Sequence, residues 1–413
     1  MKITTTAIAA LTAMFVGGCT ASTGSTAVHS APASPAPTTS AAAAQPAAAR
    51  GAEGPIESIP WSQVGPGWML ATWSPVSGTR PGEDPPAGEP TRDVAKTTLY
   101  LVDPAGGRYQ ITTFPPPGEK AEPELVDWSG DGSKALFHTA GDPATATVVD
   151  LHTGKQTTVT VDGSPRFTRP DGKALLLSHD RMSETPAKLE RVDLAGQPQL
   201  TYPTDKLKNE YNGRFLSTPD GSRLVLGTAS GLAIIGNDGT VGAPLPVPGQ
   251  ADCSPVRWWD EGSDSTVLAR CTTSDSWYTS SLWRVPIDGG APTALTAPNN
   301  GNNSGKDLGD VNAWNLPAGT FVQALGPCGV IYLAKLTDDG TTTPVSVPQV
   351  SDAKSIEVIG VDGNALDLQA QAACGGGQSL LRFDPETNTT TVLLGPPING
   401  GGVIDAVPYE GQR

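Results

Sequence analysis

Short apolar runs separated by polar turns recur along the chain from about Ile56 to its C-terminus. Leu99-Tyr-Leu-Val, Leu189-Glu-Arg-Val and Leu380-Leu-Arg-Phe are examples, and an aspartate follows each of them directly. Runs this short, bounded by turn residues, are typical of β-strands rather than helices. Asp-Gly and Asp-Pro tolerate the backbone angles of a tight reversal, so we predict that the runs form β-hairpins.

The hairpin pattern is periodic. Its turn aspartates recur roughly every 45 residues, a spacing that indicates a repeat architecture; they are Asp103, Asp150, Asp193, Asp238, Asp288, Asp338 and Asp384. A second motif, Ser/Thr-x-Pro-Asp-Gly or a variant of it, runs out of phase with the first, most clearly around Asp131, Asp171 and Asp220. Two hairpins per repeat make four strands, the content of a β-propeller blade.

We therefore predict an all-β fold, a seven-bladed β-propeller of four-stranded antiparallel blades over residues 55–413. Six or eight blades are the alternatives. The tail 402–409 is one more strand-like piece, and we expect it to pair with the first blade beside 59–73 and close the ring. Closure removes sheet edges that would otherwise invite aggregation. The alternative for the tail is a frayed terminus.

The Pro-Asp-Gly motif resembles the repeat of TolB-type, WD-like propellers of bacterial envelope proteins. The resemblance covers about 55–409, and its clear copies are those at Asp131, Asp171 and Asp220. It implies the propeller fold. TolB itself carries a folded α/β domain before its propeller, whereas in this chain a predicted Ala/Ser/Pro/Thr-rich tether takes that place. A role in the Tol machinery therefore does not follow from the resemblance.

The N-terminal 54 residues are predicted to contain an export signal followed by a spacer. An apolar run, Ile3–Val16, precedes Gly17-Gly18-Cys19. This resembles a lipobox, so we predict a signal peptide over 1–18 and lipid attachment at Cys19. Residues 19–54, rich in Ala, Ser, Pro and Thr, are predicted to be a disordered tether. The expected location is extracytoplasmic, lipid-anchored at the cell surface as in bacterial lipoproteins. An ordinary secretory signal is the alternative.

Composition and charge agree with many short strands and exclude some partners. The chain has 48 Gly and 39 Pro among 413 residues, which disfavours helical bundles. Its net charge of −15 repels phosphate backbones and anionic lipid, so we expect no nucleic-acid partner and membrane contact through the anchor alone. We expect a monomer.

Four further cysteines are an even number in an exported chain, which favours disulfides. Cys253 and Cys271 are placed side by side by one hairpin, and Cys328 and Cys374 end equivalent strands of neighbouring blades. We predict the pairs Cys253–Cys271 and Cys328–Cys374, although two other connectivities are possible. The spacing does not suit zinc, and no metal or other cofactor is expected.

Binding is expected on one face of the propeller. We number strands from the centre outwards; the first–second and third–fourth turns share the "turn face", and the second–third and fourth–first connections share the "loop face". The loop face holds long, irregular segments, including Thr272–Ser281, and variable loops usually carry binding. The candidate ligand-binding residues are Trp277, Tyr278, Arg270, His138, His179 and Arg181. Aromatics folded over the blade and solvated histidines are the alternatives.

Catalytic signatures are scarce in the sequence. It contains no Gly-x-Ser-x-Gly, no His-Glu-x-x-His and no phosphate-binding loop, so no catalytic residue is assigned. Acids near the first strands that could project into the channel are Asp127, Asp252, Asp260, Asp310, Glu357 and Asp362. We predict a non-enzymatic scaffold that binds a protein, peptide or glycan; the alternative is a hydrolase or lyase using channel carboxylates.

Overall fold

The computed structural model describes residues 50–77, 87–118, 121–180, 185–207, 210–259, 265–299, 309–325, 330–350, 355–371 and 377–411. The chain divides into two compact units, 1–44 and 45–413, and every described residue belongs to the second. The predicted signal peptide and Cys19 lie outside the described residues, as does the tether up to residue 49. Among the described residues, no helix has the length and apolar character needed to cross a bilayer.

The described secondary structure consists of β-strands and three short 3-10 turns. The turns are η1 (Ile56–Ser58), η2 (Trp61–Gln63) and η3 (Thr204–Leu207). One sheet has the order β1-β4-β3-β2-β29, formed by β1 (Glu53–Pro55), β2 (Met69–Ser74), β3 (Thr97–Val102), β4 (Arg108–Phe114) and β29 (Gly402–Pro408).

Four more sheets each contain four consecutive strands. They are β5 (Glu124–Trp128), β6 (Lys134–Thr139), β7 (Ala144–Asp150) and β8 (Gln156–Val161); β9 (Ser164–Phe167), β10 (Ala174–His179), β11 (Lys188–Asp193) and β12 (Pro198–Thr201); β21 (Asn312–Leu316), β22 (Gly319–Leu325), β23 (Ile331–Leu336) and β24 (Thr342–Pro344); and β25 (Ile356–Asp362), β26 (Ala365–Ala370), β27 (Ser379–Asp384) and β28 (Thr389–Leu394). Within each sheet, neighbouring strands pair antiparallel.

A further sheet joins two sets of four strands. One set is β13 (Tyr211–Ser217), β14 (Arg223–Thr228), β15 (Gly231–Gly236) and β16 (Val241–Pro246); the other is β17 (Gln250–Trp258), β18 (Thr266–Thr273), β19 (Ser276–Pro286) and β20 (Thr293–Ala294). A single residue pair between β14 and β17, Thr228 with Cys253, links the sets. Each set is otherwise the same four-stranded unit seen in the other sheets.

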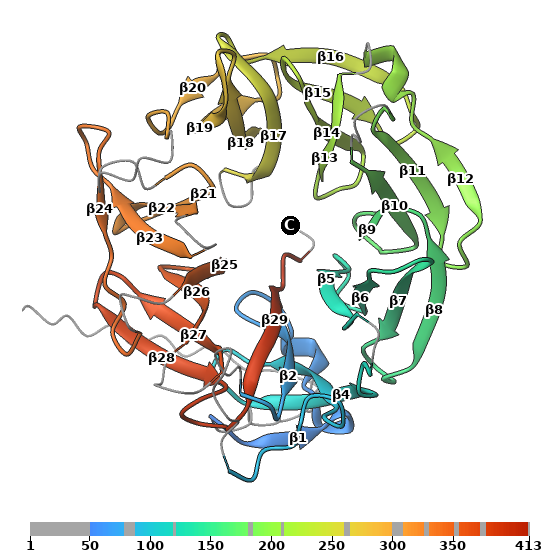
Figure 1. The fold of residues 1–413 in the computed structure, drawn as a ribbon, viewed down its shortest axis with the longest axis vertical. Helices are drawn as coiled ribbons and strands as arrows, with labels where there is room; N and C mark the ends of the chain where they lie inside the picture. The colour runs from blue at the N-terminus through green and yellow to red at the C-terminus, as the bar shows by residue number, and fades with distance from the viewer. Residues whose placement is uncertain are drawn as a thin grey trace, which may run out of the picture. The chain divides into compact units, whose positions relative to one another are not determined.

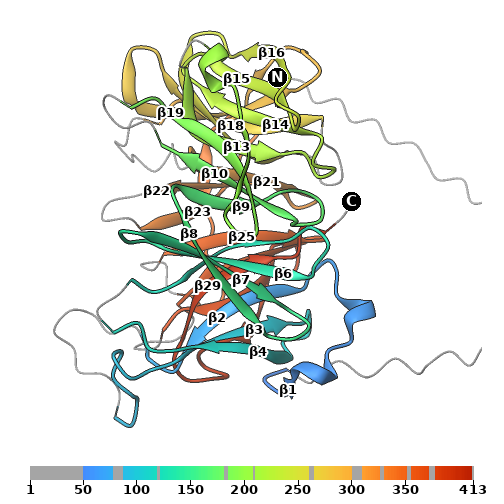
Figure 2. The ribbon, with the colours of Figure 1, turned by 90° about the vertical axis from the view of Figure 1, so that its right-hand side faces the viewer.

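Within this unit the sheets stand around a common centre, with one strand of each set innermost (Figure 1). The innermost strands are β29, β5, β9, β13, β17, β21 and β25. Figure 2 views the sheets edge-on and places the C-terminus on the opposite side from residues 87–96, which precede β3. This is the sheet arrangement of a β-propeller, as the repeat predicts.

The hydrophobic core lies between neighbouring sheets rather than inside any one of them. For example, Leu99 and Leu101 of β3 share a cluster with Phe137 of β6 and Val149 of β7. Both faces of most sheets are therefore covered, and consecutive residues such as Leu175-Leu176-Leu177 are all buried. This explains why the strands read as continuous apolar runs rather than strict alternation.

The C-terminal strand closes the ring, as the sequence predicts. β29 pairs antiparallel with β2, with Leu70 opposite Val407 and Ala71 opposite Ala406. A cluster containing Met69 of β2 and Leu393 of β28 packs the last sheet against the first. The innermost strand of the first sheet thus comes from the opposite end of the chain from the other strands of that sheet.

Asp405 ties this closing strand to its neighbours. Its Oδ2 accepts a hydrogen bond from the Leu125 backbone N–H of β5 at 3.1 Å, and its own N–H donates to Thr72 Oγ1 of β2 at 3.0 Å. Burial, reinforced by the nearby carboxylates of Glu124 and Glu122, raises the pKa of Asp405 to about 6. The folded protein therefore binds a proton at Asp405 more tightly than the unfolded chain does.

The raised pKa of Asp405 predicts that the folded protein loses stability at the ring closure as the pH rises and Asp405 ionises. A raised folded-state pKa favours folding most below pH 4, and that contribution is lost as the pH rises through about 6. Asp405→Asn, which stays neutral, should be more stable than the wild type by about 2 kcal/mol at pH 7.5, with the difference shrinking towards pH 4.5. Urea unfolding at both pH values measures it; a pH-independent difference would contradict the assignment.

Two boundaries near the start of the fold differ from the prediction. The described chain already forms β1 inside the predicted tether, because Glu53–Pro55 pairs parallel with β4 and Glu53 forms an ion pair with Arg108 at 2.9 Å. The segment 59–68, expected to contribute to the first blade, contains η2 instead, and the strand begins at Met69. The place of an innermost strand is taken there by β29.

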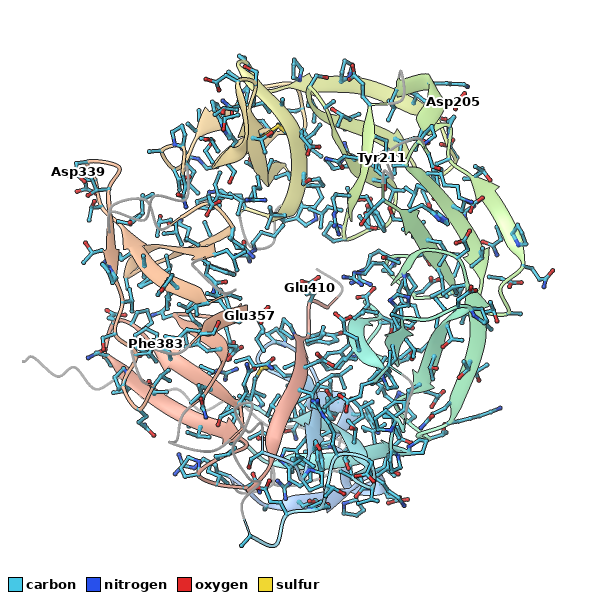
Figure 3. The ribbon with its side chains drawn as sticks, in the orientation of Figure 1. Asp205, Tyr211, Asp339, Glu357, Phe383 and Glu410 are labelled. Carbon is cyan, nitrogen blue, oxygen red and sulfur yellow. A yellow bond between two sulfur atoms is a disulfide. The ribbon has the colours of Figure 1, made fainter. Side chains whose placement is uncertain are left out.

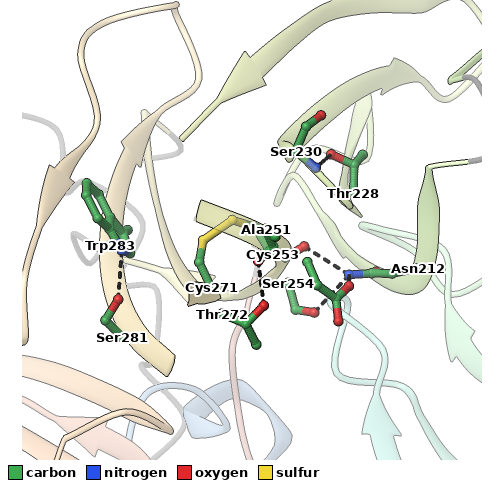
Figure 4. Close-up of a disulfide and its surroundings, with 11 residues drawn as sticks. Asn212, Thr228, Ser230, Ala251, Cys253, Ser254, Cys271, Thr272, Ser281 and Trp283 are labelled. Carbon is green, nitrogen blue, oxygen red and sulfur yellow. Dashed lines mark hydrogen bonds between the residues drawn. A yellow bond between two sulfur atoms is a disulfide. The ribbon is translucent and has the colours of Figure 1, made fainter. Parts of the chain in front are cut away.

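The structure contains the predicted disulfide Cys253–Cys271, in which β17 and β18 place the two cysteines next to each other (Figure 4). Both cysteines are fully buried. The bond closes a loop with a sequence separation of 18 residues, for which the chain-entropy relation gives about 3 kcal/mol. Cys328 and Cys374, the other predicted pair, lie outside the described residues.

Replacing both Cys253 and Cys271 with serine is expected to lower the free energy of unfolding by about 3 kcal/mol, because the unfolded chain gains the freedom of the open loop. Urea unfolding under non-reducing conditions measures the change. Adding reductant should destabilise the wild type by about 3 kcal/mol more than the double variant, which keeps only the predicted pair Cys328–Cys374; equal sensitivity of both proteins would assign the effect elsewhere.

Candidate functional site

A cavity of about 530 Å³ opens at the centre of the ring, where several innermost strands end. It is lined by residues from the ends of β5, β9, β13, β17 and β29 and from the turns that follow them. Because each innermost strand runs from the loop face to the turn face, this cavity lies on the turn face. We call it the channel cavity; its polar lining residues are Asp127, Arg166, Arg169, Ser217, Asp220, Arg257 and Glu410.

A buried ion pair forms one wall of the channel cavity. The Asp127 carboxylate accepts hydrogen bonds from Arg169 at 2.8 Å and 3.3 Å and from the Phe167 backbone N–H at 2.7 Å. Asp127 is 5 % exposed. This pair joins β5 to the turn after β9, so it positions two neighbouring sheets at the cavity. Its charges cancel.

Two other arginines bring positive charge to the cavity. Arg166 of β9 is exposed, and its guanidinium donates to the Pro165 carbonyl at 3.1 Å. Arg257 of β17 donates to the Ala313 carbonyl at 3.2 Å and lies over the Trp314 ring at 5.5 Å. An arginine stacked and hydrogen-bonded in this way is held in place to bind an anion.

Aromatic side chains supply the apolar part of the lining. Phe215 and Trp258 are half-buried and face the cavity from β13 and β17, while Trp128 and Phe167 lie deeper. The Trp258 indole N–H donates to the Ser217 carbonyl at 3.0 Å, which fixes the ring. Aromatic walls with a few oriented arginines are the usual composition of a binding site.

The C-terminal segment runs into the same cavity. Figure 3 shows Glu410 near the centre, inside the ring of innermost strands. The Tyr409 N–H donates to the Trp68 carbonyl at 2.9 Å, and the Tyr409 ring meets Trp128 edge to face at 4.9 Å. Glu410 Oε2 lies 3.9 Å from Arg169 Nη2, and its side chain remains 71 % exposed.

On the loop face, the predicted long loop around Trp277 and Tyr278 is a hairpin instead. β18 ends at Thr273 and β19 begins at Ser276, so the two aromatics lie in a strand after a two-residue turn. The β-branched threonines on both sides favour extended backbone, which explains the difference. Other loop-face connections are equally short, such as 162–163 and 229–230.

Arg270 belongs to a structural network. Its Nε donates to the Asp310 carbonyl at 2.8 Å, and its Nη2 donates to Ser280 Oγ at 2.9 Å and to Asp310 Oδ2 at 3.2 Å. Asn299 donates to the other Asp310 oxygen at 3.1 Å. The network joins β18 to the segment before β21, so Arg270 contributes to packing between sheets. Arg181, also a predicted ligand-binding residue, lies outside the described residues.

The predicted histidines have separate surroundings. His138 stands opposite Glu124 in the β5–β6 register, and burial lowers the pKa of its imidazole. His179 lies 3.4 Å from Glu190 and 3.8 Å from Asp162, beside a second cavity of about 520 Å³ on the loop face. No hydrogen bond or ring contact joins the two imidazoles. The described residues contain no group of three metal-ligating side chains placed to hold an ion.

Most of the acids considered for catalysis serve structural roles. Asp252 accepts from Asn212 Nδ2 at 3.0 Å, and Asp362 forms an ion pair with Arg382 at 2.8 Å; Asp127 and Asp310 have the partners given above. Asp260 lies outside the described residues. Glu357, on β25 (Figure 3), forms no hydrogen bond with another described residue; its side chain is exposed, yet desolvation raises its pKa.

Sequence reasoning did not single out the arginines of the channel cavity, although a signal for them was present. Arg166-Phe167 and Arg257-Trp258 place an arginine–aromatic pair at the last two residues of the innermost strands β9 and β17. Such a recurrence in equivalent positions of a repeat indicates a shared surface. It lies on the turn face, opposite the predicted binding face.

Comparisons with known proteins agree with the fold and leave the activity open. The chain matches no protein family and no curated protein by sequence. Similar solved structures include a prolyl endopeptidase (TM-score 0.48, 13 % identity, 78 % of this chain and 49 % of that chain) and the β-propeller domain of Cps50 (Swd1) from Myceliophthora thermophila (TM-score 0.42, 12 % identity, 73 % and 93 %). The propeller of the trilobed protease from Pyrococcus furiosus is a third (TM-score 0.34, 12 % identity, 68 % and 98 %). The chain spans about half the length of the prolyl endopeptidase.

Proposed function

We propose that this protein is a non-enzymatic, seven-bladed β-propeller that binds a protein, peptide or glycan at the channel cavity. The blade count is supported by the sets of four strands around the centre and by hydrophobic clusters that each join two neighbouring sets, including one across the closure. A rigid closed ring presents fixed side chains at its centre, which favours recognition.

The observation that carries the proposal is the lining of the channel cavity. Half-buried Phe215 and Trp258 flank Arg257, which is held by a carbonyl and an aromatic ring, while the nearest buried acid is neutralised by Arg169. Such a surface offers anchors for binding.

A matched pair of tryptophan variants tests the proposal. Trp258 and Trp283 both pack against the same hydrophobic cluster, but only Trp258 lines the channel cavity. The purified protein should bind members of a panel of acidic, neutral and basic peptides and oligosaccharides. Trp258→Ala should weaken that binding at least tenfold, and Trp283→Ala should not. Binding that depends on Trp277 and Tyr278 instead would place the site on the loop face.

The alternative function is a hydrolase or lyase that uses channel carboxylates, and Glu357 is the residue that favours it. A raised pKa on an innermost strand is a property of a general acid. We expect no turnover of peptide or glycoside substrates by the purified protein. Turnover that Glu357→Gln abolishes while binding persists would make the protein an enzyme.

We further propose that the protein is exported and held at the membrane by lipid on Cys19. The apolar run before Gly17-Gly18-Cys19 supports this. Cys19→Ala should release the protein into the medium or soluble envelope fraction, because two acyl chains hold a protein stably and an unlipidated cysteine holds none. Fractionation with an antibody measures it; full membrane retention of the variant would contradict the anchor.

A further inference from the structure

We infer that the channel cavity binds a neutral oligosaccharide, with one sugar ring stacked on Trp258 and its hydroxyl groups hydrogen-bonded to the polar side chains around that ring. The inference rests on the proposed function, since it selects one ligand class for the same cavity. The lining supports it through its balanced charge, its apolar aromatic surface and its hydrogen-bonding groups.

The charges of the lining cancel, which favours a ligand without net charge. Three guanidinium groups are matched by three carboxylates; they belong to Arg166, Arg169 and Arg257 and to Asp127, Asp220 and Glu410. An anionic ligand would lie beside carboxylates and a cationic ligand beside guanidinium groups, and a neutral ligand avoids both kinds of repulsion.

Trp258 offers the cavity an apolar surface. Its indole N–H already donates to the Ser217 carbonyl at 3.0 Å, which fixes the ring and engages its one polar group. Phe215, half-buried on the neighbouring innermost strand β13, extends the apolar surface. A pyranose ring has a face of C–H groups, and the negative face of an aromatic ring attracts such weakly positive groups.

The polar groups of the lining suit the hydroxyl groups of a sugar. A guanidinium can only donate hydrogen bonds and a carboxylate can only accept them, whereas a hydroxyl does both. A sugar can therefore bond to both kinds of group, and an apolar ligand would bury them without a new partner. The Ser217 hydroxyl, which forms no hydrogen bond with another described residue, can also donate or accept.

Trp128 adds a buried donor to the same lining. The residue is 3 % exposed, and its indole Nε1 has no acceptor among the described residues. A buried N–H without an acceptor costs stability, so almost all such groups in proteins have one. Trp128 lines the cavity, where an oxygen atom of a bound sugar supplies the acceptor.

The size of the cavity favours a short ligand. Its volume of about 530 Å³ lies within the range of small-molecule sites, roughly 300–1,000 Å³, whereas a protein partner needs an interface of about 800 Å² on each side. A short neutral peptide is the competing ligand, but its backbone has no flat C–H face edged by hydroxyl groups. We therefore include a peptide among the probes.

The experiment titrates the full chain by calorimetry with four neutral trisaccharides: maltotriose, cellotriose, mannotriose and triacetylchitotriose. The anionic probe is trigalacturonate, and the peptide probe is acetyl-Ala-Pro-Ala-Pro-Ala-amide. The variants are Trp258→Ala, Trp258→Phe and Asp220→Asn.

Two control variants change the same residue types outside the cavity. Trp283→Ala alters a tryptophan that packs against the same hydrophobic cluster as Trp258. Asp339→Asn alters a carboxylate at the outer side of the ring that, like Asp220, accepts a threonine hydroxyl and a backbone N–H within its own turn (Figure 3).

We expect at least one neutral trisaccharide to bind with a Kd below about 1 mM, and trigalacturonate to bind at least tenfold more weakly. The affinity for the neutral sugar should change less than twofold between 50 and 500 mM NaCl, because salt screens only charged contacts. Trp258→Ala should weaken binding at least tenfold, Asp220→Asn at least threefold and Trp258→Phe, which keeps an aromatic ring, less than fivefold. Both controls should stay within twofold of the wild type.

The inference is overturned if none of the four trisaccharides binds, if trigalacturonate binds more tightly than all of them, or if salt weakens the binding more than twofold. Trp258→Ala also removes packing, so Trp258→Phe and Asp220→Asn keep the test decisive should the alanine variant fail to fold.

Two outcomes separate this inference from the proposed function. If the peptide probe binds more tightly than every sugar and depends on Trp258, the cavity is a binding site but its ligand is not a sugar, and the inference fails alone. If Trp258→Ala alters the binding of no probe, the cavity is not the binding site and the proposed function fails with it.

Discussion

Truncating the chain after Gly401 is expected to abolish cooperative folding. The truncation removes β29, which forms the innermost strand of the first sheet through its pairing with β2. It also removes the carbonyl of Ile404, to which buried Gln369 donates at 2.7 Å, and the buried Val403 side chain. An open ring exposes the edge of β2 and the cluster that joins the last sheet to the first, which favours aggregation.

Circular dichroism melting and size-exclusion chromatography measure this result. The truncated protein should lose its sharp thermal transition or melt at least 15 °C lower, and it should elute as aggregate. A control truncation after Gly411 leaves β29 and the Tyr409 contacts in place and should melt within about 2 °C of the wild type. An unchanged melting temperature of the protein truncated after Gly401 would mean that the remaining sheets close without β29.

The second large effect is expected from Asp127→Ala, which should lower the free energy of unfolding by about 3–5 kcal/mol. The change leaves Arg169, whose side chain is 17 % exposed, without its main partner, and leaves the buried Phe167 N–H without an acceptor. A buried charge that loses its partner costs far more than an exposed one.

A double variant separates the ion pair from general damage to packing. Asp127→Ala with Arg169→Met removes both charges, so it should recover part of the stability lost in the single variant. Glu122→Ala, which breaks an exposed pair with Arg92, should cost less than about 1 kcal/mol. Urea unfolding at pH 7.5 measures all three; additive losses in the double variant would contradict the coupling.

Much of the local structure could be predicted because its causes are local. The Asp150 carboxylate accepts the His152 and Thr153 backbone N–H groups, and Asp193 does the same for Ala195 and Gln197, as expected of turn aspartates. At Asp339 the hydroxyls of two neighbouring threonines lower the carboxyl pKa to about 2. These contacts lie within five residues of each other, so sequence alone is sufficient to place them.

The channel cavity, the candidate binding site, could not be predicted in the same way. Loop length suggested the loop face, but residues near Trp277 continue the β18–β19 hairpin, and Arg270 contacts Asp310 from a distant part of the sequence. What an arginine contacts depends on which side chains and carbonyls reach it after folding. Arg169 pairs with the buried carboxylate of Asp127, whereas Arg257 donates to the Ala313 carbonyl and lies over the Trp314 ring.

The sequence by itself determined the repeat, the hairpins, the closing tail and the disulfide between Cys253 and Cys271, because neighbouring residues and a fixed period specify each of them. Only the tertiary structure decided where the channel cavity lies and which charges remain in it. Its lining comes from strands that are distant in sequence and meet only when the ring closes. Side chains that no local pattern links become neighbours there, and their mutual charge and burial decide what the cavity can bind.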